Sequence, residues 1–448
     1  MRSIRDILLV FFFSVGLSVG QDTRQDMDMS AQTKPHQATH DMANMNSNKD
    51  QTMSMESHSF IELLEKHATA GTDAEPNSTP VEMLMTAKGS WTFMFHGVAF
   101  LDDIQQSGPR GGDRLFSTNW LMPMAQRKLG KGVLTLRAML SLEPATISQR
   151  RYPELFQQGE TAFGLPIADG QHPHNFFMEL AAEYDYKLSE NTMLSFYAAP
   201  MGDPAMGPVA YPHRASASED PIATLGHHLE DSTHISGDVI TVGVTRRNFR
   251  LEASGFHGRE PDEHRWDLAS GGMDSWSSRL TLNPGQNWSF QYSLARLHSP
   301  EALFPNEDVR RMTASLMYNR PMRKGNWDST MLWGRNQSLS DGNVGNGYLL
   351  ESTLQFLNKN YVWSRIENVD RTNELLLGEN PLPPGFTERY FTRVQAYTVG
   401  YEREVGHIPH LSAAIGGQIM WYGAPEMLKP IYGSQPLGGV VFLRVRPH

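Results

Sequence analysis

The chain has 448 residues, of which 39% are hydrophobic and 20% are charged, and it contains no cysteine. The lack of cysteine excludes disulfides, thiolate zinc sites and cysteine nucleophiles. A formal net charge of −10 argues against nucleic acid as a partner, because affinity for phosphates comes from lysine and arginine. After the N-terminal segment, no apolar run reaches the roughly 18 residues of a membrane-spanning helix, which excludes a helical membrane protein.

Residues 1–20 are predicted to be a secretory signal peptide. Arg2 and Arg5 form its charged start, residues 7–19 its apolar stretch, and residues 18–20 the small side chains of a cleavage site. The alternative is an uncleaved anchor helix, for which the apolar stretch is too short. We therefore expect an exported bacterial protein.

Residues 21–80 contain few core-forming residues and are predicted to be a disordered, periplasmic segment. The one helix expected in it covers residues 59–68, where Ser59 and Glu62 fit a capping box.

Methionine and histidine recur along this segment. Thioether sulfur is a soft ligand suited to Cu(I), and imidazole binds both Cu(I) and Cu(II). The alternative is a solvated low-complexity tail in which methionine is incidental. No tightly bound cofactor is expected, and copper ions are the metal that these donors favour. The donors predicted to bind metal are Met27, Met29, His36, His40, Met42, Met45, Met53, Met55 and His58.

From residue 88 onward, apolar and polar side chains alternate with a period of two. In residues 176–188, for example, apolar side chains alternate with a second set that carries the charges of Glu179, Glu183, Asp185 and Lys187. Such strands fit a soluble sandwich, with the apolar face inward, or a transmembrane barrel, with that face toward lipid. The alternation alone leaves both open.

The lengths of the connections favour the barrel. Long connections such as 144–171 and 201–233 alternate with tight ones such as Leu129-Gly130 and Pro284-Gly285. This is the pattern of external loops and periplasmic turns in an outer-membrane barrel, whose closure also satisfies every backbone group. We therefore predict an all-β, transmembrane antiparallel barrel in residues 81–448. Its sixteen strands are expected near 88–100, 114–128, 131–143, 172–188, 191–200, 234–246, 247–258, 273–283, 286–298, 308–320, 325–337, 346–358, 359–370, 387–404, 408–421 and 436–446.

From about residue 88 to its end, the chain resembles bacterial outer-membrane β-barrel proteins, which implies a Gram-negative outer membrane and contact with its lipids. Residues 27–58 resemble the Met/His-rich leader of copper-resistance outer-membrane proteins of the CopB type, by composition rather than by a fixed motif. One departure concerns the C-terminus. Outer-membrane barrels often end in an aromatic residue, whereas Phe442 is the last aromatic residue before the terminal residues 445–448 here.

Histidine is concentrated in the predicted external loops. Neutral imidazole with carboxylate binds Cu(II), Zn or Ni, so His213, His227, His228 and His234 are predicted metal ligands. Prolines stiffen the 201–233 loop, which would allow it to fold inward as a constriction. The alternative is a polar loop stabilised by hydrogen-bonded histidines. Other histidines in these loops and their flanks are His172, His174, His257, His264 and His298.

Charged residues of both signs are predicted to face the lumen. They would either select permeating solutes through a transverse field or pair with one another and fill the lumen. Both possibilities stay open from the sequence. The residues are Arg137, Glu179, Glu183, Asp185, Lys187, Arg250, Glu252, Glu351, Arg365, Glu367 and Arg393.

An enzyme is not expected, because the sequence has neither a phosphate-binding glycine loop nor a His-Glu-x-x-His zinc helix. The favoured function is binding or passage of copper or a similar metal cation at the outer membrane. The alternative is a general or solute-selective porin with an incidental Met/His-rich arm. The expected partners are membrane lipids and metal ions or small solutes, while the oligomeric state is left open.

Overall fold

The computed structural model describes residues 57–66 and 68–447, without the side chain of His407. These residues belong to one compact unit. The predicted signal peptide and the predicted metal donors from Met27 to Met55 lie outside the described residues, so both remain predictions.

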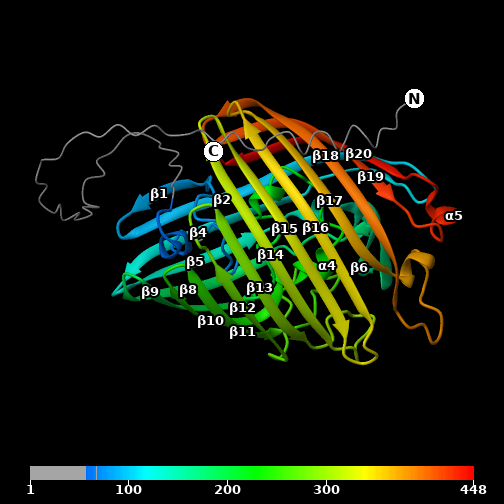
Figure 1. Cartoon of the computed structure of the whole chain (residues 1–448), viewed down its shortest axis with the longest axis horizontal. Coiled ribbons are helices and arrows are strands. Elements are labelled where there is room, and N and C mark those ends of the chain that lie inside the picture. The colour runs from blue at the N-terminus through cyan, green and yellow to red at the C-terminus, as the bar shows by residue number, and fades with distance from the viewer. Residues whose placement is uncertain (1–56, 67, 448) are drawn as a thin grey trace, which may run out of the picture. The chain divides into compact units, whose positions relative to one another are not determined.

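Sixteen antiparallel strands form a closed barrel in the described part of the chain (Figure 1). Each barrel strand pairs with the next one, and the last returns to the first, from Ala99 opposite Val445 to Gln106 opposite Gly438. The predicted all-β, sixteen-stranded antiparallel barrel is therefore confirmed. Its strands are β2 (Trp91–Gln106), β4 (Asn119–Leu129), β5 (Gly132–Leu140), β8 (Phe177–Ser189), β9 (Thr192–Gly202), β10 (Ser236–Arg246), β11 (Phe249–His257), β12 (Ser275–Leu282), β13 (Trp288–Leu297), β14 (Val309–Met322), β15 (Gly325–Ser338), β16 (Val344–Phe356), β17 (Asn360–Thr372), β18 (Tyr390–Ile408), β19 (Leu411–Gly423) and β20 (Leu437–Pro447).

Side chains along the barrel strands alternate between the lumen and the outer surface. On β4, Met122 and Met124 are buried, whereas Leu121 is 46% exposed. On β18, Tyr401 is exposed on the outside, and the neighbouring Glu402 is buried on the inside. An outer surface of leucine, valine and aromatic side chains around a polar interior is the surface expected of a barrel in lipid.

The predicted strands agree with the observed ones to within a few residues, and long and tight connections alternate as expected. In the tight turn between β4 and β5, Gly130 has a φ of +61°, which glycine adopts without strain. Four further strands were not predicted. Strands β1 (Leu84–Lys88) and β3 (Asp113–Phe116) pair with β2, and β6 (Tyr152–Ala162) forms a hairpin with β7 (Leu165–Gln171).

The helices are short. Within residues 57–66 and 68–447, none is both long and apolar enough to cross a bilayer. They are α2 (Phe60–Leu64), α3 (Glu143–Thr146), α4 (His227–Glu230) and α5 (Lys429–Tyr432), with 3-10 turns η1 (Ser148–Arg150), η2 (Ala215–Ala217), η3 (Ser232–His234) and η4 (Asn373–Leu376).

Most of residues 57–66 and 68–83 are buried inside the barrel, so the prediction of a disordered segment as far as residue 80 is wrong for its last part. The expected helix is present as α2, and the hydroxyl of Ser59 accepts a hydrogen bond from the N–H of Glu62 at 3.2 Å. Farther along, Asp73 forms an ion pair with Arg279 of β12. A polar segment needs no apolar core of its own where a polar wall supplies its hydrogen bonds.

Residues 203–235, here called the constriction loop, connect β9 to β10 and also fold into the lumen. Almost all of them are buried, and η2 and α4 contact β15 and β16. Nε of Arg214 lies 2.6 Å from Glu351 on β16, and Arg365 on β17 pairs with Asp220 at 3.1 Å. The loop therefore folds inward, as its prolines predicted.

The lumenal charges mostly pair with one another. Arg137 lies 2.8 Å from Glu179, Arg250 lies 3.0 Å from Glu252, and Arg365 lies 3.2 Å from Glu351. At these positions the charges fill the lumen in pairs, which is one of the two possibilities left open by the sequence.

The prediction that Arg393 faces the lumen is wrong. Its guanidinium is half-exposed, pairs with Asp370 at 2.6 Å and covers the ring of the exposed Tyr348. The next residue, Val394, is fully buried and sets the inward face of β18. A shift of one residue moves a strand side chain to the opposite face, which explains the error.

Candidate metal centre

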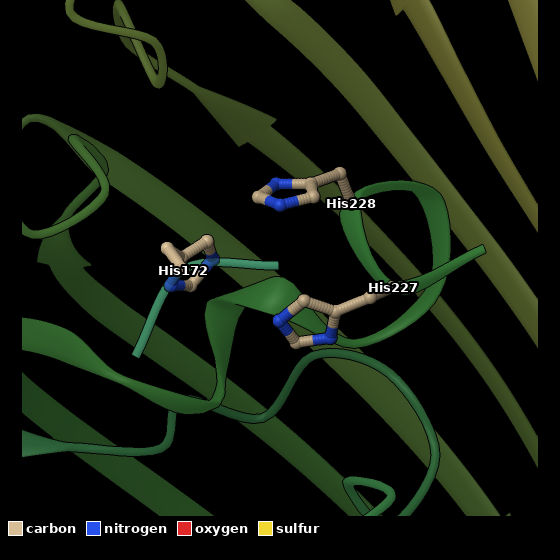
Figure 2. Close-up of side chains that lie close together, drawn as sticks. All are labelled: His172, His227 and His228. Atoms are coloured by element: carbon tan, nitrogen blue, oxygen red, sulfur yellow. The ribbon is translucent and has the colours of Figure 1, made fainter. Parts of the chain in front are cut away.

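Three histidines meet inside the barrel, and they come from two separate parts of the chain. His172 follows β7, whereas His227 and His228 begin α4 in the constriction loop. One ring nitrogen from each lies within 4.8 Å of those of the other two. Figure 2 shows the three imidazoles around a common space. We call these three residues the imidazole cluster.

Each imidazole is held by a contact to one ring nitrogen. Nδ1 of His227 lies 2.7 Å from Asp231, and Nδ1 of His228 lies 3.3 Å from Glu260. Nδ1 of His172 lies 3.1 Å from the carbonyl oxygen of Pro173. Carboxylate and carbonyl partners of this kind fix the orientation of metal-binding imidazoles and make them more basic. Nε2 of His228 has no such partner and is left for a ligand.

A fourth donor lies beside the cluster. Glu160 on β6 lies 3.1 Å from Nε2 of His172 and also pairs with Arg265. Nε2 of His228 is buried and has no hydrogen-bond partner among the described residues. Three imidazoles with a carboxylate are a donor set that suits Zn²⁺ and Cu²⁺.

Gly159 on β6 makes room for this arrangement. A Cβ at this position would lie 2.4 Å from Nε2 of His228, and the glycine has a φ of +121°, which other residues rarely adopt. The hairpin of β6 and β7 is thus shaped to admit the imidazole of His228 and to bring Glu160 next to His172.

Two more histidines extend the cluster. The ring of His234 lies 5.3 Å from that of His227, and the ring of His174 lies 5.5 Å from that of His234. His174 is held by Glu143 at 2.9 Å and by the hydroxyl of Tyr211 at 3.2 Å. Nε2 of His234 is buried without a hydrogen-bond partner in the part of the chain that the structure describes. The five imidazoles therefore form a continuous series.

Burial keeps three of these imidazoles, those of His172, His227 and His234, neutral. It lowers the pKa of His172 well below its usual value, lowers the pKa of His227, and lowers the pKa of His234 to about 3. Neighbouring imidazoles act in the same direction, because two cations in a water-poor site repel each other. Only neutral imidazole has a lone pair for a metal.

The lowered pKa values predict an unusual pH dependence. A solvent-exposed histidine site loses metal as the pH falls through about 6.5, where imidazole gains a proton. At His172 and His227 the proton binds more weakly, so the affinity for Zn²⁺ should stay nearly constant from pH 7.5 to 6 and fall only below that range. Calorimetric titration of the full-length protein in detergent at several pH values measures this. A tenfold loss of affinity between pH 7 and pH 6 would contradict it.

No family model and no curated protein matches the sequence. Among solved structures, the barrel is similar to the anion-selective porin from Comamonas acidovorans, with a TM-score of 0.50 and 10% identity over 80% of this chain and 99% of the porin. The fold is that of an outer-membrane porin. Two further similar structures are OprB from Pseudomonas putida (TM-score 0.47, 9% identity, 80% of this chain and 94% of that one) and a loop-deletion mutant of OmpT from Vibrio cholerae (0.45, 8%, 80% and 100%).

Within this porin fold, the predicted metal ligands are separated into three groups. His227 and His228 form the imidazole cluster with His172, and His234 lies next to them. His213 packs elsewhere, against Met139 and Trp120. His58 is exposed near the tight turn between β12 and β13, where its carbonyl accepts a hydrogen bond from Gln286.

The other loop histidines are held by single carboxylates at or near the surface. His257 pairs with Asp274, His264 with Asp262 and His298 with Asp308. At these positions the alternative of hydrogen-bonded loop histidines fits the structure. Glu160, Gly159 and Glu260 were not predicted, because nothing in the local sequence links them to His172 or to the constriction loop.

Proposed function

We propose that this protein is an outer-membrane porin-like barrel that binds copper or a similar late first-row metal cation in its lumen and governs its passage. The imidazole cluster carries the proposal. Three convergent imidazoles, each oriented by an oxygen partner, suit such a cation and have little use in a pore for general solutes.

The surroundings of the cluster support a cationic ligand. Asp231, Glu260, Glu160 and Glu143 all contact histidines of the extended series. Buried carboxylates favour a positive charge between them. The contents of the lumen also favour a bound ion over bulk flow, because the constriction loop and residues 57–83 occupy the interior.

A solute-selective porin is the second candidate. The sixteen-stranded barrel favours it, because porins of this size enclose an aqueous channel. The two functions differ in what crosses the barrel, so reconstituted vesicles can distinguish them.

The experiment uses full-length protein in lipid vesicles that contain a metal-sensitive dye. We expect Zn²⁺ or Cu²⁺ to reach the dye faster than in protein-free vesicles, and we expect little swelling of the same vesicles in sugar or amino-acid solutions. Rapid swelling with no advantage for the metals would favour the solute-selective porin. Vesicles loaded with heat-denatured protein serve as the control.

The Met/His-rich arm is proposed to collect copper and supply it to the barrel. Its thioethers act by number and softness, since each is a weak ligand and a chain predicted to be disordered loses entropy with every bond. Replacing Met27, Met29, Met42, Met45, Met53 and Met55 together by leucine should abolish Cu(I) binding by a peptide of residues 21–56, whereas any single replacement should change little. Leucine keeps the apolar bulk and removes only the sulfur. Equal Cu(I) affinity of the six-leucine peptide would show that the methionine pattern is incidental.

A further inference from the structure

The lumen wall holds a second set of metal donors, built from methionine and histidine. Strands β2 and β4 are neighbours, and their register sets His96 opposite Met122 and Met94 opposite Met124. Directly opposed residues of antiparallel strands project on the same face. That face is the lumenal one, because Met94, Met122 and Met124 are at most 3% exposed.

Two further donors complete this set. Met139 is 1% exposed and lies on the lumenal side of β5, the strand next to β4. His213 approaches it from the constriction loop, so that Nε2 of His213 lies 3.2 Å from Sδ of Met139. The ring of His96 lies 5.9 Å from that of His213, and the indole of Trp120 packs against both.

The sulfur atoms around these histidines are numerous. One buried cluster contains Met83, Met94, Met122, Met124, Met139, Met178 and Met201. A barrel lumen is normally lined by polar side chains, and apolar packing alone is served as well by leucine. Methionine differs from leucine in its soft, polarisable sulfur, which is a ligand for Cu(I).

The two histidines have ring nitrogens that packing does not explain. Nδ1 of His96 and Nδ1 of His213 are both buried without a hydrogen-bond partner among the described residues. A buried polar atom is normally paired, so each unpaired one calls for a ligand or a water molecule. Stacking on Trp120 satisfies the faces of the rings but not their nitrogens.

A cavity gives access to these donors. It has a volume of about 150 Å³, and its lining includes His96 and His213 together with the carboxylates Glu82, Glu183 and Glu219. The same lining includes Arg137 and Arg446, which pair with these carboxylates, so the cavity carries charges of both signs. The cavity also borders Leu63 and other residues of the 57–83 segment, which continues from the Met/His-rich arm along the chain.

We propose that His96, His213 and Met139, with the neighbouring thioethers, form a Cu(I) site in the lumen. The site shares no residue with the imidazole cluster, and its preference for a soft monovalent ion goes beyond the proposed function. The set of two imidazoles with at least one thioether is suited to Cu(I) and poorly suited to Zn²⁺ or to hard cations.

The test measures Cu(I) affinity of the full-length protein in detergent, under reducing conditions, by competition with a chromophoric Cu(I) chelator. All variants carry leucine at the six arm methionines, so that the arm contributes no thioether. In this background, Met139→Leu should weaken Cu(I) binding about tenfold, and the double variant Met139→Leu with His213→Gln about 100-fold or more. Met193→Leu is the matched control, because Met193 is equally buried but belongs to a different cluster, with Phe60 and Leu64.

The results of this test can be distinguished from those of the test of the proposed function. Zn²⁺ binding at the imidazole cluster should be unchanged in Met139→Leu, and retained Zn²⁺ binding also shows that the variant is folded. X-ray absorption of the Cu(I)-loaded background protein should show both sulfur and nitrogen neighbours. The proposal is overturned if the background protein binds no Cu(I), or if Met139→Leu and the double variant bind it as tightly as Met193→Leu does.

Discussion

Replacing His227 and His228 together by glutamine should lower the affinity for Zn²⁺ and Cu²⁺ about 100-fold or more, since two of three imidazoles are lost. Glutamine retains a polar side chain of similar length, which can still contact Asp231 and Glu260. The constriction loop should therefore stay folded, and the loss should be one of ligands. Calorimetric titration of the detergent-solubilised protein measures the affinity directly.

A second variant tests the geometry without removing a ligand. Gly159→Ala places a methyl group 2.4 Å from Nε2 of His228, so the imidazole must move from its position in the cluster. We expect metal affinity to fall about tenfold while all histidines are present. His257→Gln is the matched control, because His257 is held by one carboxylate, Asp274, outside the cluster. If the metal affinity of the cluster variants falls no further than that of His257→Gln, the metal binds elsewhere.

The barrel itself was predictable from the sequence because its strands obey a local rule. Lipid on one side and polar groups on the other impose a period of two, as in β4, where Leu121 faces out and Met122 faces in. Turn signals such as Gly130 then mark the tight connections. These features require only neighbouring residues, so the sixteen strands could be located before the structure was known.

The contents of the lumen could not be predicted in the same way. Residues 57–83 and the constriction loop have no periodic pattern, and their positions depend on partners far away in the sequence. Asp73 meets Arg279, and Arg214 meets Glu351, only after the barrel has closed. A polar composition predicted disorder for the first of these segments, because the sequence does not show that a polar wall surrounds it.

The candidate site was partly visible. The adjacent pair His227-His228 indicated a donor site, and the structure adds His172 through the β6–β7 hairpin, which was not predicted. The lumenal methionines also have a signal in the local sequence, on which no prediction was based. Met122 and Met124 alternate with Leu121, which places thioethers rather than polar side chains on the lumenal face of β4.

Replacing Arg214 by leucine should release the constriction loop from the barrel wall. The guanidinium is fully buried, lies 2.6 Å from Glu351 of β16 and 3.3 Å from Asp231, and donates a hydrogen bond of 3.0 Å to the carbonyl of Val209. Removing one partner of a buried ion pair costs about 3–5 kcal/mol, because the remaining charges lose their compensation. Since the strand ladder does not include Arg214, this cost should act on the loop rather than on barrel assembly.

Two effects should follow in the Arg214→Leu protein. Single-channel conductance in planar bilayers should rise several-fold, because the loop no longer fills the lumen. The affinity for Zn²⁺ should fall, because Asp231 loses its contact with Arg214 and no longer holds His227 in a fixed orientation. Arg393→Leu is the matched control. Its ion pair with Asp370 is half-exposed on the outer face and contributes about 0–1 kcal/mol, so neither property should change. If conductance and Zn²⁺ affinity of Arg214→Leu equal those of the control, then Arg214 does not anchor the loop, and the packing of its apolar residues holds it in the lumen instead.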